Sequence, residues 1–276
     1  MPATATAPLP VLETVLLKRD GRLLTITLDR PEALNAFDEQ MHQDLVDVLA
    51  FVADDPSSDV LVLTGAGRAF SAGGDLAYVA DNAHHPERFD ADVRRAKRIV
   101  YGLLDLDKPI VCRLNGHAIG LGATLALLCD IIFAAEGAKI GDPHVSVGLV
   151  AGDGGAFVWP QRIGHARAKE YLLTGDPIPA STAAEIGLIN HCVPASELDG
   201  AVDAFCQRLL AGSRNAIRWT KVLVNLELKR IAHAVMDPGI AYEAVTVRSA
   251  DHRAAVEALL DKRTPSFHDD DPERER

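Results

Sequence analysis

Short apolar segments alternate with helical segments over the first half of the chain, and this alternation limits the possible folds most. The strand-like segments are rich in Val, Ile and Leu, and they are Leu23–Leu28, Val60–Thr64, Ile110–Leu114 and Ile131–Ala135. The helical segments between them cover 38–51, 87–104 and 121–128, and Asp38 is the expected N-cap of the first. From His165 onward the pattern is mainly helical, with one strand-like piece over 188–193. This order predicts an α/β core followed by a helical C-terminal part.

The composition suits one large domain, or a domain with an appendage, and argues against several classes of function. Of the 276 residues 48% are hydrophobic, so the chain can bury a sizeable core. A formal net charge of −11 and a pI near 5.3 argue against a nucleic-acid partner. No window holds the roughly 20 apolar residues that cross a bilayer, and residues 1–8 do not resemble a signal peptide. We therefore expect a soluble cytoplasmic protein with no membrane partner.

The cysteines and histidines are not spaced as metal ligands or as redox pairs. Cys112, Cys129, Cys192 and Cys206 are widely separated, which is typical of free thiols in a reducing compartment. His84 and His85 precede a proline in a polar stretch, which predicts a solvated loop. No metal site is expected. Residues 268–276 are charged and poor in apolar side chains, which predicts a frayed end.

Several segments carry motifs of one enzyme superfamily, in order and at fitting spacing. They are Arg30–Ala36, Leu63–Leu76, Asn115–Asp130, Asp142–Gly155, Leu173–Ala180, Ala184–Asn190 and Asp261–Phe267. These segments resemble the crotonase (enoyl-CoA hydratase/isomerase) superfamily. The resemblance implies an α/β fold, a crotonase-like spiral of ββα units with a helical C-terminal region. It also implies a core domain over residues 1–200, a helical trimerisation region over 201–276, and assembly as a homotrimer or a dimer of trimers.

Two glycine-rich stretches among these segments suit the chemistry of that superfamily. Its reactions pass through an enolate or a tetrahedral oxyanion, which two backbone N–H groups stabilise. By position in the family motifs, the donors here are the amides of Gly74 and Leu121. Gly73 lets the first loop come close to a ligand. Gly120 and Gly122 lie where a helix begins, and the free N–H groups and dipole of a helix N-terminus favour an anion.

The resemblance further implies an acyl-CoA substrate, so coenzyme A is expected as part of the substrate and not as a bound cofactor. The residues at the family's positions for contact with this substrate are Glu32, Ala33, Leu34, Ala72, Gly73, Asp75, Leu76, Gly120, Gly122, Thr124 and Lys262. Lys262 and Arg263 are placed to meet the phosphates of the nucleotide. A basic residue near the end of a chain is also commonly just solvated.

Thr124 and His144 stand where the family's hydratases have their two catalytic glutamates. Thr124 has no useful acidity, so it is either a helix residue or a hydroxyl that holds a water or a substrate oxygen. His144 suits a general base, because the ordinary pKa of histidine is near 6.5. Asp153 either orients that imidazole, as the acid of a catalytic triad does, or is a turn or N-cap residue.

Glu243 is a further candidate acid. Residues 236, 240, 243, 247, 250 and 254 fall on one helical face, and Glu243 lies in the middle of that apolar stripe. A buried carboxylate needs a partner, so Glu243 reaches a site, pairs with a base or forms an inter-subunit salt bridge. His144, Asp153 and Glu243, with Val158–Pro160, locally resemble the β-diketone hydrolase branch of the superfamily, the 6-oxocamphor hydrolase type. His42 is the candidate for a further histidine of that branch, or else a core histidine.

These residues lead to three functional hypotheses. The first is an enzyme of the enoyl-CoA hydratase/isomerase family that stabilises the enolate of an acyl-CoA, with poor hydratase activity because both glutamates are absent. The second is a hydrolase that cleaves a carbon–carbon bond of a β-diketone, or a CoA thioester, with His144 as the base and Asp153 as its partner. The third is a non-catalytic acyl-CoA-binding scaffold.

Overall fold

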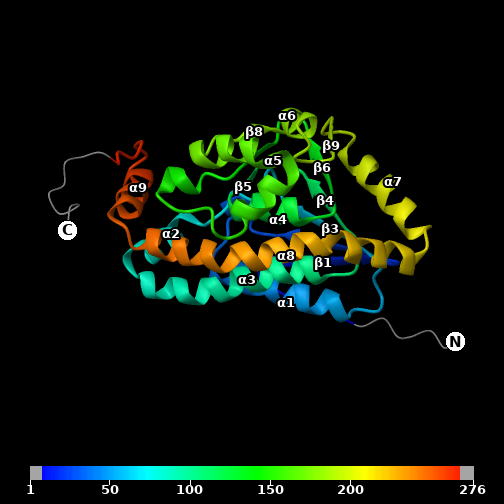
Figure 1. Cartoon of the computed structure of the whole chain (residues 1–276). Helices are drawn as coiled ribbons and strands as arrows, with labels where there is room; N and C mark the ends of the chain where they lie inside the picture. Colours follow the sequence, from blue (N-terminus) through cyan, green and yellow to red (C-terminus); the bar gives the residue numbers. More distant parts are fainter. Residues whose placement is uncertain (1–7, 268–276) are drawn as a thin grey trace.

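The main sheet has six strands and is parallel except at one edge (Figure 1). In the computed structural model, which describes residues 8–267, its strands lie in the order β1 (Val15–Asp20), β2 (Leu23–Leu28), β3 (Val60–Gly65), β4 (Ile110–Leu114), β6 (Ile131–Ala135) and β9 (His191–Val193). β1 and β2 form an antiparallel hairpin, and the following strands join in parallel. β3 is buried along its whole length, as expected of a central strand in a parallel sheet.

A second, three-stranded sheet supports the segments that matter most for function. It consists of β5 (Ala118–Ile119), β7 (Lys139–Gly141) and β8 (Ile178–Pro179). β5 leads directly into Gly120 and the next helix, and β7 leads into Asp142. Because β5 pairs with β7, the sheet brings these two exits to the same place.

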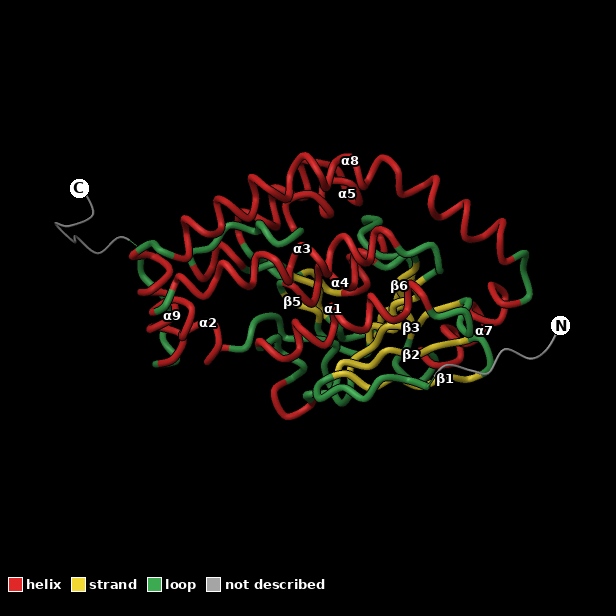
Figure 2. The backbone as a smooth tube through the Cα atoms, turned by 90° about the horizontal axis from the view of Figure 1, so that it is seen from below, coloured by secondary structure: helices red, strands yellow, loops and turns green. Residues whose placement is uncertain are grey.

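Helices surround the main sheet and make up most of the C-terminal part. They are α1 (Glu39–Asp54), α2 (Leu76–His84), α3 (Phe89–Asp105), α4 (Leu121–Leu128), α5 (Gly155–Thr174), α6 (Ala180–Glu185), α7 (Leu198–Leu210), α8 (Arg214–Val247) and α9 (Ala250–Leu260). Short 3₁₀ helices are η1 (Pro31–Ala33), η2 (Pro86–Arg88) and η3 (His144–Val147). The long helix α8 packs against α3 and α5 (Figure 2).

Local sequence explains where α1 and α4 begin. The Asp38 carboxylate accepts a hydrogen bond from the Met41 amide at 2.8 Å, which confirms the predicted N-cap of α1. α4 begins directly after Gly120, and all eight of its residues are buried. The N-terminus of α4 therefore lies inside the protein, with its free N–H groups directed at the interior.

The strands β5, β7 and β8 of the second sheet are absent from the predicted elements, and the structure differs from the prediction at three further places. β1 is not among the predicted strands. It forms a hairpin with β2 that turns at Gly21, whose φ of 56° suits glycine. α2 is also additional, and His84 is its last residue, exposed as a solvated residue should be. α5 begins at Gly155 and not near His165, because the backbone is already helical from Gly155 and is only interrupted at Gly164, where φ is 77°.

The C-terminal apolar stripe is divided between two helices. Met236, Ile240 and Val247 are buried on α8 together with Glu243, as predicted. Ala250 and Ala254 belong to α9, because the chain turns after Val247 and Ser249 caps a new helix by accepting the His252 amide. The prediction of one continuous helical face over all six positions is therefore wrong.

All four cysteines are unpaired, and those at 112, 129 and 206 are buried, in agreement with the prediction of free thiols. Among residues 8–267, none of the helices has the length and apolarity that a membrane span requires. The predicted frayed end over 268–276 lies outside the described residues, as do residues 1–7 of the N-terminal segment.

Candidate active site

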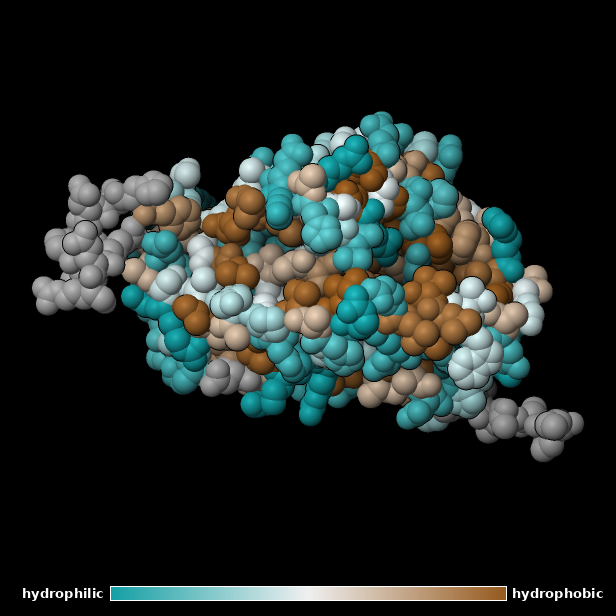
Figure 3. Space-filling model, viewed as in Figure 1, coloured by the Kyte–Doolittle hydropathy of each residue, from teal (hydrophilic) through white to brown (hydrophobic). Residues whose placement is uncertain are grey.

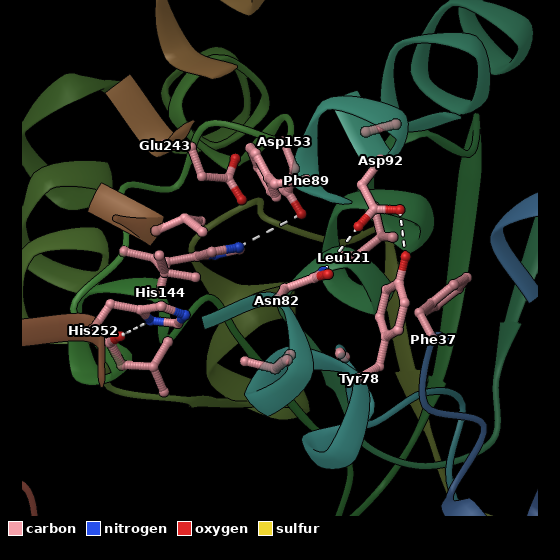
Figure 4. Close-up of a pocket in the computed structure, with 18 of the residues that line it drawn as sticks. Phe37, Tyr78, Asn82, Phe89, Asp92, Leu121, His144, Asp153, Glu243 and His252 are labelled. Atoms are coloured by element: carbon pink, nitrogen blue, oxygen red, sulfur yellow. Dashed lines mark hydrogen bonds and ion pairs between the residues drawn. The ribbon is translucent and has the colours of Figure 1, made fainter. Parts of the chain in front are cut away.

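A cavity of about 300 Å³ lies where the two glycine-rich loops, η3 and helices α2, α3, α8 and α9 meet. Figure 4 shows the side chains that line it, which come from segments far apart in the sequence. Two of the lining residues, Leu76 on α2 and Leu259 on α9, are 41% and 38% exposed. These two leucines therefore mark the mouth of the cavity.

The first glycine-rich loop places Gly74 on the wall of this cavity. Gly73 has a φ of 88°, and a side chain there would lie 2.9 Å from the Ile119 carbonyl oxygen, so the position requires glycine. The Phe37 amide donates to the Gly73 carbonyl, and the Asp75 amide donates to the Phe37 carbonyl. These two hydrogen bonds form an isolated parallel β-bridge between Phe37 and Gly74. The Gly74 amide itself donates to no backbone acceptor among the described residues.

A buried asparagine holds this loop in place. Asn35 is fully buried, and its side-chain amide donates to the carbonyls of Ala66 and Ala69 at 2.9 Å each. Its carbonyl oxygen Oδ1 accepts from the Arg30 amide at 2.9 Å. The sequence motif around residues 30–36 thus fixes the first glycine-rich loop, a role that its resemblance to a CoA-contact segment does not predict.

The second glycine-rich loop brings the Leu121 amide beside the first. Leu121 is the first residue of α4, so its amide has no intrahelical partner. Gly120 has a φ of 54° and a ψ of −124°, a conformation that is essentially restricted to glycine. A Cβ atom built on Gly120 would lie 3.9 Å from Gly73 Cα and 3.8 Å from His144 Cε1. The two loops and the imidazole therefore meet at one point.

His144 is held between two carboxylates. Its Nδ1 pairs with Oδ1 of Asp142, and its Nε2 lies 3.6 Å from Oδ2 of Asp153. Burial alone lowers the pKa of His144, but the charges of Asp142 and Asp153 outweigh it and raise the pKa well above the usual value. The two carboxylates therefore favour the protonated form of the His144 imidazole.

Asp142 is the member of this group that the sequence analysis misses. Its side chain is fully buried, and a Cβ atom on Gly155 would clash with its Oδ2, so Gly155 makes room for the carboxylate. The signal available in the sequence is the spacing of Asp142 and His144, two residues apart after a strand. That spacing is common in turns, and the pairing depends on η3 bending the chain back.

Asp153 and Glu243 complete the acid–base group. Burial raises the pKa of Asp153. Burial, aided by the charge of Asp153, also raises the pKa of Glu243 to about 8. Gly152 and Gly239 pack closely, with a Cβ on Gly152 only 2.8 Å from Glu243 Oε2, which brings α8 against the Asp153 loop. Glu243 thus reaches the site, the first of the roles left open for it.

The comparisons with known proteins decide the family. A family model described as enoyl-CoA hydratase/isomerase matches residues 18–270. A probable enoyl-CoA hydratase of Mycobacterium bovis is 33% identical over 260 residues, 92% of this chain and 98% of the relative. The chain belongs to the enoyl-CoA hydratase/isomerase family. A 1,2-epoxyphenylacetyl-CoA isomerase of Escherichia coli K12 is 34% identical over 259 residues, 93% of this chain and 99% of the relative.

A solved structure confirms the fold of this family member. The crystal structure of an enoyl-CoA hydratase/isomerase from Mycobacterium paratuberculosis matches with a TM-score of 0.86 and 38% identity. The match covers 90% of this chain and 99% of that one. The predicted α/β crotonase fold, with ββα units and a C-terminal helical region, is therefore correct, and the protein is an enzyme of the hydratase/isomerase type.

The hydratase/isomerase family positions predicted to touch substrate divide into two sets. Ala72, Gly73, Leu76 and Gly120 line the cavity, as do the predicted catalytic residues Gly74, Leu121, His144, Asp153 and Glu243. The residues outside the lining are Glu32, Ala33, Leu34, Asp75, Gly122, Thr124 and Lys262. Their contact with coenzyme A stays a prediction.

The second set has structural contacts of its own. The Leu34 carbonyl accepts from the Ala72 amide at 3.0 Å, and Asp75 caps α2 and pairs with Arg30. Gly122 packs against Ser71, whose Cβ would lie 2.7 Å from an added Cβ. Glu32 on η1 and Lys262 after α9 are exposed, the latter with a φ of 56°.

Thr124 lies behind the acid–base group and not on the cavity. It is fully buried, and a Cβ on Gly154 would lie 2.5 Å from its methyl group. Its hydroxyl oxygen has no hydrogen-bond partner among the described residues. Thr124 thus supports the Asp153 loop, and its correspondence to a hydratase glutamate stays a prediction.

One group within residues 8–267 has potential metal-ligand atoms that all lie within 4.8 Å of one another. It consists of Asp142, His144 and Asp153. Both imidazole nitrogens of His144 already face a carboxylate oxygen. A protonated imidazole has no lone pair for a metal ion. The expectation of no metal site stays a prediction, and the geometry suits proton transfer.

We expect Glu243→Gln to change the pH dependence of stability. The glutamate titrates near 4.5 in its ordinary state and near 8 in the folded protein. The folded state thus binds this proton more tightly, so the wild-type free energy of unfolding falls as pH rises from about 4.5 to about 8. The variant lacks this loss, which amounts to at most about 1.4 kcal/mol per pH unit.

Urea unfolding at several pH values within this window tests the prediction. The variant should gain stability relative to wild type as pH rises, whereas Glu257→Gln, at an exposed glutamate of α9, should run parallel to wild type. His144 contributes in the same direction in all three proteins, because its raised pKa adds stability that is lost as pH rises. Parallel curves for Glu243→Gln and wild type would rule out the buried, protonated carboxyl.

Proposed function

We propose that this family member forms the enolate of an acyl-CoA thioester and moves a proton at the carbon next to the thioester carbonyl. The amides of Gly74 and Leu121 hold the enolate oxygen, and the His144–Asp153 pair carries the proton. The observation behind the proposal is the position of His144, whose Cε1 lies beside Gly120 at the junction of the two loops. An imidazole there faces whatever carbon is attached to the bound carbonyl.

The steps follow from the charges in the site. The thioester oxygen binds between the two amides, which are stronger donors to an enolate than to a neutral carbonyl. The neutral form of His144 accepts the proton from the α-carbon at Nε2, which lies 3.6 Å from Asp153 Oδ2, farther than a hydrogen bond. The resulting imidazolium lies between Asp142 and Asp153, which stabilise its charge. Returning the proton to the enolate, at the same or a conjugated carbon, completes an exchange or an isomerisation.

Exchange of α-protons with solvent deuterium tests this proposal without knowledge of the natural substrate. Hexanoyl-CoA is incubated with the protein in D₂O, and mass spectrometry follows deuterium at the α-carbon while a thiol reagent follows release of free CoA. Enzyme-dependent exchange supports the proposal. Binding by calorimetry without exchange would contradict it and favour the non-catalytic scaffold. Release of CoA without exchange would favour thioester hydrolysis.

A second candidate function is the hydrolytic cleavage of a β-diketone. It is supported by the acids around His144, because Asp153 Oδ1 and Glu243 Oε2 are buried oxygens without a hydrogen-bond partner among residues 8–267. Such oxygens suit the binding and activation of water. In this reaction water adds to one ketone, the carbon–carbon bond breaks, and the oxyanion hole holds the enolate that leaves. Consumption of a cyclic β-diketone by protein that does not bind hexanoyl-CoA would favour this candidate over the first.

We also propose that the chain assembles as a homotrimer or a dimer of trimers through its helical region 201–276. The first half of α8 exposes a group of large apolar side chains, Trp219, Leu223, Val224 and Leu226, which are 56–73% exposed. Figure 3 shows apolar residues gathered over this part of the molecule. Contiguous exposed apolar surface of this kind commonly marks an interface. Light scattering on the purified protein tests the proposal, and a monomer at micromolar concentration would contradict it.

A further inference from the structure

A second polar group lines the cavity on the side away from His144. It consists of His42 on α1, Tyr78 and Asn82 on α2, and Asp92 on α3. Tyr78 donates to Asp92 Oδ1 at 2.5 Å, and the Asn82 amide donates to Asp92 Oδ2 at 2.9 Å. In Figure 4 Tyr78 and Asp92 lie on the right of the pocket, and His144 and Glu243 lie on its left. We call the four residues the distal cluster.

The distal cluster has unused hydrogen-bond acceptors. His42 is only 9% exposed, and its Nδ1 lies 2.7 Å from the Asp38 carbonyl oxygen, so Nδ1 carries the hydrogen and Nε2 keeps a lone pair. Burial lowers the pKa of His42, which keeps the ring neutral. Asn82 is 7% exposed, and its Oδ1 has no hydrogen-bond partner among the described residues. The Tyr78 oxygen, which donates to Asp92, can still accept.

The charge of the distal cluster is already compensated within the protein. Asp92 is buried and accepts from Arg95 at 3.1 Å in addition to Tyr78 and Asn82. A cationic ligand group would find both carboxylate oxygens of Asp92 already engaged, and an anionic one would be repelled by that carboxylate. The chemical group that fits is a neutral hydrogen-bond donor.

Most of the other side chains that line the cavity are apolar. The apolar walls include Phe37, Val79, Phe89, Val93, Ala96 and Ile240. An alkyl chain would fill such a space without any polar group, and a buried acceptor that stays unpaired costs free energy. A purely structural role for the distal cluster, as a tie between α2 and α3, accounts for Asp92 but leaves the buried, unpaired Asn82 Oδ1 unexplained.

We infer that the distal cluster is a specificity site for a hydroxyl group on the acyl part of the substrate. This inference rests on the proposed function, since it places the thioester at Gly74 and Leu121 and the acyl chain along the apolar walls. The hydroxyl donates its hydrogen to His42 Nε2 or Asn82 Oδ1. The substrate class is therefore a hydroxyacyl-CoA, and a plain acyl-CoA of the same length binds less tightly.

Calorimetric binding of matched ligand pairs to the wild-type protein tests this inference. The pairs are ω-hydroxyhexanoyl-CoA with hexanoyl-CoA, and the corresponding butanoyl and octanoyl pairs. We expect the hydroxylated member of at least one pair to bind about tenfold more tightly, the value of one good hydrogen bond. Equal affinity within every pair, or a preference for the plain acyl group, would overturn the inference while leaving the proposed function intact. Failure of both members to bind would overturn both.

Variants locate the preference on the distal cluster. Asn82→Leu and His42→Phe keep the approximate volume of each side chain and remove its acceptor, so the preference should fall to about twofold or less. Asn225→Leu is the control, because Asn225 lies on α8 outside the cavity lining and donates to the Leu104 carbonyl. A preference that persists in both folded cluster variants would overturn the assignment. The wild-type comparison stands by itself if a variant does not fold.

Discussion

Replacing His144 with glutamine is expected to slow α-proton exchange of hexanoyl-CoA by about 100- to 10,000-fold, the usual contribution of a general acid–base residue. Glutamine retains a polar side chain of similar length beside Asp142, but it cannot carry a proton. Binding of hexanoyl-CoA should change little, because the Gly74 and Leu121 amides remain. Mass spectrometry for exchange and calorimetry for affinity separate the two effects.

His84→Gln is the matched control for this substitution, because His84 is exposed at the end of α2. Its exchange rate should equal that of wild type. Wild-type exchange should also increase as pH rises through neutrality, because the raised pKa of His144 means that more of the neutral base forms at higher pH. Near-normal exchange in His144→Gln, or a rate that falls with rising pH, would remove His144 from the chemistry.

Replacing Gly120 with alanine should have the second largest effect, an exchange rate lower by about 100-fold or more, as when one oxyanion donor is lost. Gly120 has a φ of 54° and a ψ of −124°, which a residue with a Cβ rarely adopts. The backbone must relax, and the Leu121 amide, attached to the next residue, turns away from the oxyanion. Stability should fall by about 1–3 kcal/mol as well.

Gly137→Ala separates the loss of the donor from the loss of stability. Gly137 has a φ of 86° in the turn between β6 and β7, and a Cβ there would meet no atom within 4 Å. Both variants should unfold at lower urea concentration than wild type. Only Gly120→Ala should lose exchange activity, and equal exchange rates in the two folded variants would show that Leu121 is not a donor.

Strands and helices could be predicted from sequence where local pattern decides them. The buried run of β3 and the Asp38 cap of α1 are local signals, and both are confirmed. β1 is an edge strand of alternating burial whose pairing with β2 depends on the turn at Gly21, and its segment carries a weak pattern by itself. The break between α8 and α9 occurs at Ser249, which caps the new helix α9. The periodic apolar pattern of the sequence continues across this position, so the pattern alone predicts one helix.

The residues of the candidate site also divide into those that the sequence predicts and those that it does not. Gly73, Gly120, His144, Asp153 and Glu243 could be predicted because each lies in a motif or on a marked helical face, and all line the cavity. His42 of the distal cluster is a candidate from the sequence, but Asp142 and the other members of the cluster, Tyr78, Asn82 and Asp92, could not be predicted. Their partners come from η3, α1, α2 and α3, and only the packing of these elements brings the side chains together.

The mouth of the cavity has an evolutionary consequence. Leu76 and Leu259 lie at the edges of α2 and α9, which contact each other, while the proposed oxyanion donors belong to Gly74 and to Leu121 at the start of α4. Substitutions on α2 and α9 can therefore reshape the acyl compartment while the reacting groups keep their positions. A lineage with this architecture can exchange one acyl substrate for another through a few changes in two helices, and the inherited chemistry is preserved throughout.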